Sequence, residues 1–201
     1  MFTGIVEETG VIESITHSEK SIRLKLRAPT VGQGAGLGDS IAVNGCCLTV
    51  IDIEPLDKAW RLQFDLLLET WQRTSFSQAL VGQPINLERS LPADGRLHGH
   101  FVTGHVDGTA QIRLMEKRGA DWLLEIVPDP AALKYLVFKG AIAIDGISLT
   151  VAEVLPDAFR VWIIPHTLAV TSLHARKPSD IVNLEFDILA KYVERLISLR
   201  P

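Results

Sequence analysis

The chain has 201 residues, of which 47% are hydrophobic and 22% are charged, and its formal net charge is −4. This size suits one large or two small globular domains with a sizeable core. The acidic balance disfavours a nucleic-acid surface, and no apolar run approaches the roughly 18 residues that a membrane span needs. The first residues lack a secretory signal, and the adjacent Cys46 and Cys47 suit neither an ordinary disulfide nor zinc-ligand spacing. We therefore expect a cytoplasmic protein without nucleic-acid or membrane partners.

The second half of the chain repeats the first. In IAVNGCCLTV (residues 41–50) and IAIDGISLTV (residues 142–151), six of ten aligned positions are identical. The flanking blocks recur in the same order, residues 2–12 as 102–112, 69–75 as 166–172, and 86–88 as 183–185. Matched blocks at a nearly constant offset indicate a duplicated domain. We expect a first unit at 1–97 and a second at 98–187, separated near the Pro- and Gly-containing residues 91–97.

Short alternating polar and apolar segments predict strands in both units. We expect strands at Ser21–Ala28, Arg61–Leu66, Trp122–Val127 and Phe159–Ile164. Brief helical turns are expected at Thr70–Leu80 and Pro130–Phe138. Short strands without long intervening helices favour an all-β fold of two antiparallel barrels, because a closed barrel leaves no free edges.

The last segment, residues 188–201, has no counterpart in the first half. Asp187 can cap a helix that runs to about Leu199 with apolar residues along one side. A helix of about 13 residues is marginal in water unless its apolar face is covered. The face can dock on its own barrel or form an oligomer seam, and the lack of a counterpart favours the seam.

Two conspicuous motifs carry little functional weight. The glycines of residues 32–38, GQGAGLG, match neither a dinucleotide nor a Walker motif, and they precede a predicted strand. We interpret them as a turn. His98 and His100 share a face of an extended segment, but His105 points to the other face, so we predict no metal site.

The informative positions are those where the two copies differ. Ile5 corresponds to His105, Cys47 to Ser148, and Glu69 to His166, within otherwise similar surroundings. Thr49 and Thr150 are retained and offer hydroxyl groups in both halves. Two related pockets with unlike functional groups suggest two similar ligands held in unlike roles.

Each of these residues also has a structural interpretation. A thiol such as Cys47 is often a small buried hydrophobe, and a histidine such as His105 is often a satisfied strand residue. Lys139 would be a solvated surface lysine in most chains. Composition and spacing alone lead to a duplicated barrel with one pocket in each half.

Four motifs make the similarity to a known family specific. They are MFTGIVEE at residues 1–8, NGCCLTV at 44–50, GHFVTGHVDG at 99–108 and KGAIAIDGISLTV at 139–151. In order and spacing they resemble riboflavin synthases of the alpha type over essentially the whole chain. One departure is Trp71, which stands where the family usually has Leu.

The resemblance implies a fold, a reaction and an assembly. The family has two six-stranded Greek-key barrels and a C-terminal helix through which three subunits associate. It converts two molecules of 6,7-dimethyl-8-ribityllumazine into riboflavin and 5-amino-6-ribitylaminouracil by transfer of four carbons, without a metal or redox cofactor. The site lies between the N-terminal barrel of one subunit and the C-terminal barrel of another. Some members sit inside a lumazine synthase capsid, which makes such a capsid a candidate partner.

The resemblance also implies site residues. Substrate-binding positions in the first half are Phe2, Gly4, Ile5, Val6, Ser40, Cys47, Leu48, Thr49, Asp65, Leu66, Leu67, Leu68, Glu69 and Thr70. Those in the second half are His105, Val106, Asp107, Lys139, Ser148, Leu149, Thr150, Trp162, Ile163, Ile164, Pro165, His166, Thr167 and Asp187. Asp187 would serve the ligand more than the helix cap.

The expected catalytic residues are Cys47, His105, Ser148 and Thr150. An imidazole is suited to proton abstraction near neutral pH, so His105 is the expected general base. Cys47, a Ser148 hydroxyl or a water is the expected nucleophile or proton relay. The main alternative is a non-catalytic lumazine or flavin carrier on the same fold, but such carriers lack counterparts of Cys47 and His105. A structural or oxidoreductase barrel is less consistent with the sequence, because no nucleotide-binding domain is present.

Overall fold

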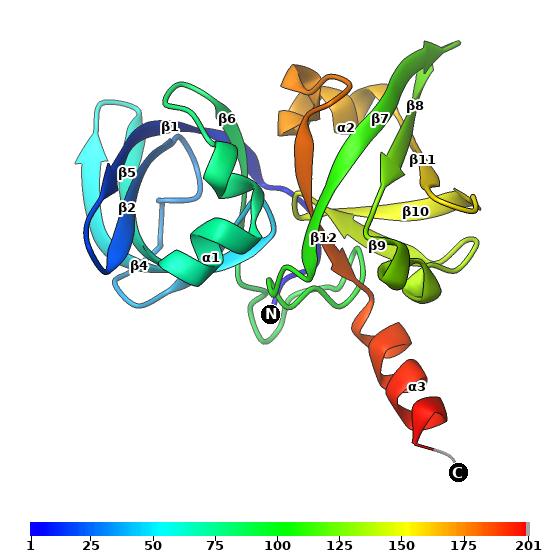
Figure 1. Ribbon diagram of the computed structural model, residues 1–201. Helices are drawn as coiled ribbons and strands as arrows, with labels where there is room; N and C mark the ends of the chain where they lie inside the picture. The colour runs from blue at the N-terminus through cyan, green and yellow to red at the C-terminus, as the bar shows by residue number, and fades with distance from the viewer. Residues whose placement is uncertain (200–201) are drawn as a thin grey trace.

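The computed structural model describes residues 1–199 and contains two closed barrels side by side (Figure 1). The first consists of β1 (Glu8–His17), β2 (Ser21–Ala28), β3 (Ser40–Val43), β4 (Cys46–Leu56), β5 (Ala59–Leu67) and β6 (Pro84–Arg89). Between β5 and β6 lie α1 (Leu68–Arg73) and the 3-10 helix η1 (Ser75–Gln78). The strands are antiparallel and close in the order β1-β2-β5-β4-β3-β6.

The second barrel repeats this order with β7 to β12. Its strands are β7 (Gly108–Arg118), β8 (Asp121–Val127), β9 (Ala141–Ile144), β10 (Ile147–Val154), β11 (Phe159–Ile163) and β12 (Ile181–Phe186). Its short helices are η2 (Pro130–Tyr135), α2 (Pro165–Val170) and η3 (Ser172–Ala175). Each barrel has its own apolar core, which includes Phe64 in the first and Phe159 in the second. The prediction of a duplicated six-stranded all-β fold is therefore confirmed.

The local predictions mostly agree with the structure. The strand predicted at Ser21–Ala28 matches β2, and the other three predicted strands lie in β5, β8 and β11. Residues 32–38 form turns before β3, as interpreted. The helix α2 was missed, because Pro165 follows a strand directly and only the tertiary context shows that it opens a helical turn.

The repeated decapeptide forms a two-residue hairpin in each barrel. Asn44-Gly45 joins β3 to β4, and Asp145-Gly146 joins β9 to β10. All four turn residues have positive φ, as this type of hairpin requires. The two tips meet between the barrels, and a Cβ atom added at Gly45 would lie 2.6 Å from the nitrogen of Gly146. Glycine is therefore required by both backbone conformation and space.

Two equivalent asparagines bind the barrels together crosswise. Asn86 of the first barrel donates from Nδ2 to the carbonyl of Asp145 at 2.9 Å and accepts from the Ser172 N–H at 2.6 Å. Asn183 of the second barrel donates to the carbonyl of Asn44 at 2.8 Å and accepts from the Ser75 N–H at 2.7 Å. All these groups are buried, so each lost bond would leave an unsatisfied polar group.

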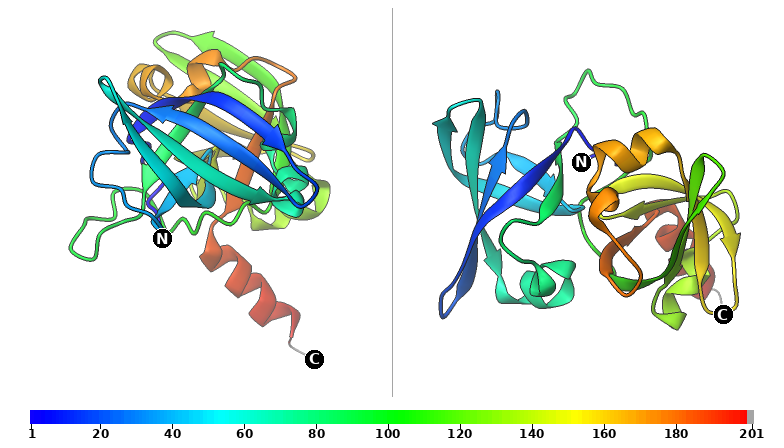
Figure 2. Two further views of the ribbon diagram at one scale, coloured as in Figure 1. Left: turned by 90° about the vertical axis from the view of Figure 1, so that its left-hand side faces the viewer. Right: turned by 90° about the horizontal axis from the view of Figure 1, so that it is seen from above.

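The C-terminal helix α3 (Ile188–Ser198) extends away from the second barrel (Figures 1 and 2). The Asp187 side chain caps it by accepting from the Leu189 N–H at 3.0 Å. Lys191 pairs with Asp107, and Glu194 pairs with Lys134, which fixes the helix at its base. Five of its apolar side chains are exposed, namely Leu189, Tyr192, Val193, Leu196 and Ile197, and so is Leu199 at its C-terminal cap. The apolar face therefore does not dock on its own barrel. Positions 200 and 201 of the expected C-terminal segment lie outside the described residues.

Among residues 1–199, no helix has the length and apolar character needed to cross a membrane.

The contact between the hairpin tips predicts a specific sensitivity to substitution. Gly45→Ala should destabilise the protein more than Gly82→Ala, a matched control with positive φ but nothing within 4 Å of an added Cβ. The control should cost about 1–2 kcal/mol from backbone strain alone. Gly45→Ala should cost about 1–3 kcal/mol more because of the overlap with the other tip. Urea denaturation measures both, and equal losses would contradict the described packing.

Candidate functional site

A buried carboxylate in each barrel fixes a turn that precedes the first strand. Glu88 accepts from the N–H and the hydroxyl of Thr3 at 2.6 and 2.7 Å, and from the Gly4 N–H at 3.0 Å. Glu185 holds Thr103 and Gly104 in the same way, at 2.6, 2.7 and 2.9 Å. Burial raises the pKa of Glu88, although these hydrogen bonds oppose the shift. The repeated Asn-Leu-Glu motif contained the signal for both carboxylates, but the sequence analysis gave them no role.

The two turns fixed in this way reach across to the opposite barrel. The Gly104 carbonyl accepts from the Cys47 N–H at 2.8 Å, and the Gly4 carbonyl accepts from the Ser148 N–H at 2.7 Å. A Cβ atom on Gly104 would lie 2.6 Å from Cβ of Cys47, so only glycine allows this approach. Consistently, Val6 packs against the core of the second barrel and Val106 against the core of the first.

This crossing corrects the grouping implied by the sequence. We expected the turn that contains Gly4 to line the same pocket as Cys47, but the structure places Gly4 beside Ser148. The turn that contains Gly104 instead lies beside Cys47. Each candidate site is therefore assembled from both halves of the chain, because the connections into β1 and β7 pass between the barrels.

The adjacent cysteines differ in environment. Cys46 is buried in the first core, and burial raises the pKa of its thiol to about 12. Cys47 is half-buried on the opposite face of β4, where it packs against Phe2, Ala42 and Val102. A thiolate is the reactive form of cysteine, so Cys46 is unsuited to chemistry. Cys47 is the cysteine that faces the seam between the barrels.

Ser148, the counterpart of Cys47, has a partner that the sequence analysis did not identify. Its hydroxyl lies 2.7 Å from Nδ1 of His100, whose Nε2 is buried with no hydrogen-bond partner in the structure. Burial lowers the pKa of His100, so the imidazole is neutral near neutral pH. In the tautomer that carries its proton on Nε2, the imidazole can accept the proton of the Ser148 hydroxyl at Nδ1.

The other candidate catalytic residues lie on the surface. His105 is exposed, and its N–H lies 3.4 Å from the Thr103 hydroxyl. Thr49 and Thr150 are exposed on the outer faces of β4 and β10. Lys139 is exposed and has a positive φ of 64°, with its N–H donated to the Val151 carbonyl at 2.8 Å.

Several residues implied by the resemblance are placed where their side chains cannot line an open pocket. Phe2, Leu48, Leu66 and Ile163 are buried, the first between the barrels and the others inside them. Strand alternation is the reason, since every second residue of a range points inward. These residues can shape a site only through their neighbours or backbone.

Two carboxylates have structural duties. Asp107 accepts from the Phe186 N–H at 2.9 Å and from Lys191 at 2.7 Å, and it thereby anchors α3. Asp187 is the N-terminal cap of the same helix, and its expected role in ligand binding stays a prediction.

The remaining implied residues lie at equivalent corners of the two barrels. Glu69 is exposed in α1 and pairs with Arg73 at 2.9 Å, and its counterpart His166 is exposed in α2. Leu149 packs partly against the second core, whereas Asp65 and Trp162 are exposed on β5 and β11. The others are exposed or half-buried where β5 meets α1 and β11 meets α2, namely Leu67, Leu68, Thr70, Ile164, Pro165 and Thr167.

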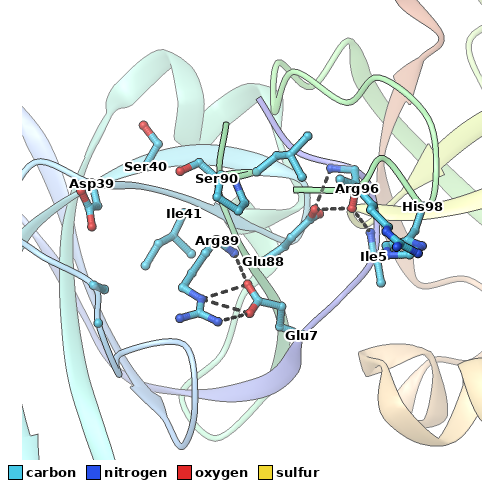
Figure 3. Close-up of a pocket in the computed structure, with 15 residues that line it drawn as sticks. Ile5, Glu7, Asp39, Ser40, Ile41, Glu88, Arg89, Ser90, Arg96 and His98 are labelled. Carbon is cyan, nitrogen blue, oxygen red and sulfur yellow. Dashed lines mark hydrogen bonds and ion pairs between the residues drawn. The ribbon is translucent and has the colours of Figure 1, made fainter. Parts of the chain in front are cut away.

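A cavity of about 470 Å³ opens beside the first barrel under the linker (Figure 3). Of the implied residues, Ile5 and Ser40 line it, together with Arg96 from the linker and His98 just after it. The ion pair between Glu7 and Arg89 forms part of its wall, with the closest atoms 2.6 Å apart. The cavity is thus lined by the candidate residue Ser40 of β3 but not by Cys47. Within residues 1–199, no group of three or more His, Cys, Asp or Glu side chains could hold a metal ion.

Comparison with known proteins identifies the repeated unit. The family model of the lumazine binding domain matches residues 3–90 and again residues 103–187. The structure is similar to that of LumP complexed with riboflavin, with a TM-score of 0.84, 26% identity, and 92% of this chain and 99% of that chain covered. LumP complexed with 6,7-dimethyl-8-(1'-D-ribityl) lumazine matches with a TM-score of 0.82 and 24% identity over the same shares. The chain is thus built from two lumazine binding domains.

Sequence similarity to curated proteins identifies the family more specifically. The chain is 42% identical to the riboflavin synthase of Actinobacillus pleuropneumoniae, with 100% of this chain and 92% of the relative covered. It is 41% identical to that of Bacillus subtilis, with shares of 98% and 90%. It is 42% identical to that of Mycobacterium tuberculosis, with 98% of both chains covered. The chain belongs to the riboflavin synthase family.

Proposed function

We propose that this chain catalyses the dismutation of 6,7-dimethyl-8-ribityllumazine. One molecule transfers four carbons to a second, which gives riboflavin and 5-amino-6-ribitylaminouracil. The observation that carries this proposal is a pair of equivalent contacts between the barrels, here called the two seams, that present different functional groups. Cys47 against Gly104 and Ser148 against Gly4 are equivalent in backbone but present a thiol and a hydroxyl. Two identical substrates in unequal roles need such an arrangement.

The reaction requires proton transfers and a nucleophilic addition. A proton must leave the C7 methyl group of one lumazine, and a nucleophile must add at C7 of the other. His105 is the proposed general base, because its imidazole is exposed and a neutral imidazole nitrogen can accept a proton. Cys47 is the proposed nucleophile or relay on this side, since its N–H bond to Gly104 holds it next to the peptide before His105.

The second seam supplies a different proton path. The proton of the Ser148 hydroxyl can pass to Nδ1 of His100, which gives an alkoxide and an imidazolium with no change in their combined charge. Thr150 offers a further hydroxyl on the same face of β10. Stacking two rings between such groups would convert an encounter of two molecules into a local event.

Purified protein incubated with 6,7-dimethyl-8-ribityllumazine alone should form riboflavin, followed by its absorbance. Cys47→Ser and His105→Gln should each lower turnover by about a hundredfold or more, as expected for loss of acid–base or nucleophilic groups. Cys46→Ala is the matched control and should retain turnover, because Cys46 points into the core. If both active-site variants kept near-normal turnover, the proposed chemistry would be wrong and positioning alone would have to suffice.

A second candidate function is a non-catalytic lumazine or flavin carrier. The similarity to LumP, 26% identical and complexed with riboflavin, favours it. The same incubation separates the two functions, since tight binding of a fluorescent ligand without riboflavin formation would support the carrier.

We also propose that three copies associate through α3. Its apolar face is exposed, and an isolated helix of this length is marginal in water. A site shared between the first barrel of one copy and the second barrel of another would follow from that assembly. The proposed domains are residues 1–97 and 98–187, and residues 188–201 form the proposed association segment. The proposed location of the protein is the cytoplasm.

The assembly predicts a concentration-dependent mass. Light scattering after size exclusion should give a trimer, and Leu196→Asp should give monomers because it buries a charge in the helix contact. Arg195→Gln, an exposed polar change on the same helix, is the control and should leave the trimer intact. Monomers of the unaltered chain at micromolar concentration would contradict the assembly.

A further inference from the structure

The segments that precede the last strand of each barrel meet between the barrels. The 3-10 helix η1 of the first barrel packs against β12, and η3 of the second packs against β6. Both segments line a cavity of about 240 Å³. A second hollow of about 50 Å³ shares Gln83, Arg176 and Asp180 with it and is also lined by Ser172. The two hollows together are here called the inter-barrel cavity.

The two copies differ in charge at this cavity. In the repeat, Leu80 corresponds to Lys177 and Gln83 corresponds to Asp180. Lys177, Asp180 and Arg176 are the charged residues that line the cavity within residues 1–199, and all three come from the second barrel. Two are positive and one is negative. The cavity therefore has a polar side with a net positive charge.

Two buried polar atoms at the cavity lack hydrogen-bond partners among residues 1–199. The Arg176 side chain is 16% exposed and binds the buried Asp145 through Nη2 at 2.7 Å, but its Nε has no acceptor. Ser172 is 1% exposed, and its hydroxyl has no partner either. Buried polar groups are normally hydrogen-bonded, so these two atoms indicate an occupant of the cavity that supplies acceptors.

Two amide side chains add further donors. Asn44 accepts from the Asn86 N–H through Oδ1 at 2.8 Å, and Gln83 accepts from the Leu80 N–H through Oε1 at 2.8 Å. Both residues line the cavity. Since the oxygen of each amide is already engaged, the end that is left for a ligand is the NH₂ donor.

Ser179 lines the cavity in an unusual backbone conformation. Its φ is 77°, and its counterpart in the first barrel is Gly82 with a φ of 88°. The left-handed region favours glycine, because a Cβ atom is disfavoured there. A serine thus places a hydroxyl group at the cavity at a conformational cost, as is common at binding sites.

A cavity with many donors and a net positive lining suits an oxyanion, which arginine binds by charge-assisted hydrogen bonds. The one carboxylate of the lining decides between oxyanions. Asp180 accepts from the Lys177 N–H through Oδ2 at 3.0 Å and can accept a further proton donor at Oδ1. A phosphate group that keeps one proton can donate its hydroxyl to Asp180. Sulfate has no proton near neutral pH, so the carboxylate would repel it.

We propose that the inter-barrel cavity binds a protonated phosphate group, either as the free ion or as part of a phosphomonoester. Arg176 Nε and the Ser172 hydroxyl bind its oxygens at the buried end. The amides of Asn44 and Gln83 donate to the remaining oxygens, and Asp180 accepts its proton. None of these residues is among the implied substrate-binding positions, so the inference does not depend on the proposed function.

Bound water is a weaker explanation of the cavity. Water would satisfy the unpartnered atoms of Arg176 and Ser172, and the volume has room for several molecules. Water needs no charged lining, however, and therefore leaves the charge difference between the two copies unexplained.

The test is calorimetric titration of the full-length chain with inorganic phosphate and, in parallel, with glycerol 3-phosphate. Inorganic phosphate should bind at one site per chain, and sulfate should not bind under the same conditions. Binding of the ester as well would show that the site takes a phosphomonoester. Phosphate should also raise the urea midpoint of unfolding, because a ligand of the folded state stabilises it.

Three variants test the assignment of the site. Ser172→Ala should weaken phosphate binding about tenfold, the loss expected for one hydrogen bond to a charged group. Asp180→Asn should allow sulfate to bind, because it removes the repelling charge. Lys177→Gln should weaken phosphate binding, whereas the matched control Lys117→Gln, at an exposed position of the same barrel, should not.

Two results would overturn the inference. One is that the unaltered chain binds neither phosphate form, or binds sulfate as tightly as phosphate. The other is that Ser172→Ala and Asp180→Asn leave phosphate affinity and the discrimination against sulfate unchanged, which would place any bound ion elsewhere.

Discussion

The contact between Gly45 and Gly146 is the constraint on which the rest of the structure depends. Two hairpin tips meet there so closely that neither accepts a Cβ atom. Asn86 and Asn183 then exchange hydrogen bonds across the same contact, each satisfying backbone groups of the opposite barrel. A duplicated domain of about 90 residues buries a limited core by itself, so the contact between the hairpin tips adds buried surface that each barrel lacks alone. Its near-symmetry brings equivalent strands of the two barrels into equivalent positions.

Once the backbone is fixed in this way, side-chain divergence has direct chemical consequences. Cys47 and Ser148 occupy the same place on related strands, yet in the described part of the chain it is Ser148 that has a half-buried imidazole within hydrogen-bond distance. The hairpin tips also differ, since Asn44 is neutral while Asp145 is fully buried and paired with Arg176 at 2.7 Å. The scaffold is shared, and the functional groups that it presents are unequal. This combination is what a reaction between two copies of one substrate requires.

The fold was largely predictable from the sequence because the repeat shows which segments of the two halves are equivalent. Strand alternation and the capping residue Asp187 then placed β2 and α3. The crossing of the turns that contain Gly4 and Gly104 was not predictable, because a repeat indicates equivalent segments but not which barrel each contacts. The pairing of His100 with Ser148 was hidden for the same reason, since 48 residues separate them.

Within the candidate site, the resemblance implied ranges of residues, and the structure shows which side chains of each range point inward and which point outward. Alternation sends Leu48 and Leu66 inward, while Thr49 and Asp65 point outward.

The central claim is that two copies of one substrate meet on unequal surfaces of one duplicated scaffold. The balance of the reaction tests this claim most directly. Chromatography of a completed reaction should show two lumazine molecules consumed for each riboflavin formed, with one equivalent of 5-amino-6-ribitylaminouracil. Riboflavin formed from one lumazine and a different carbon donor, without the pyrimidine product, would contradict it.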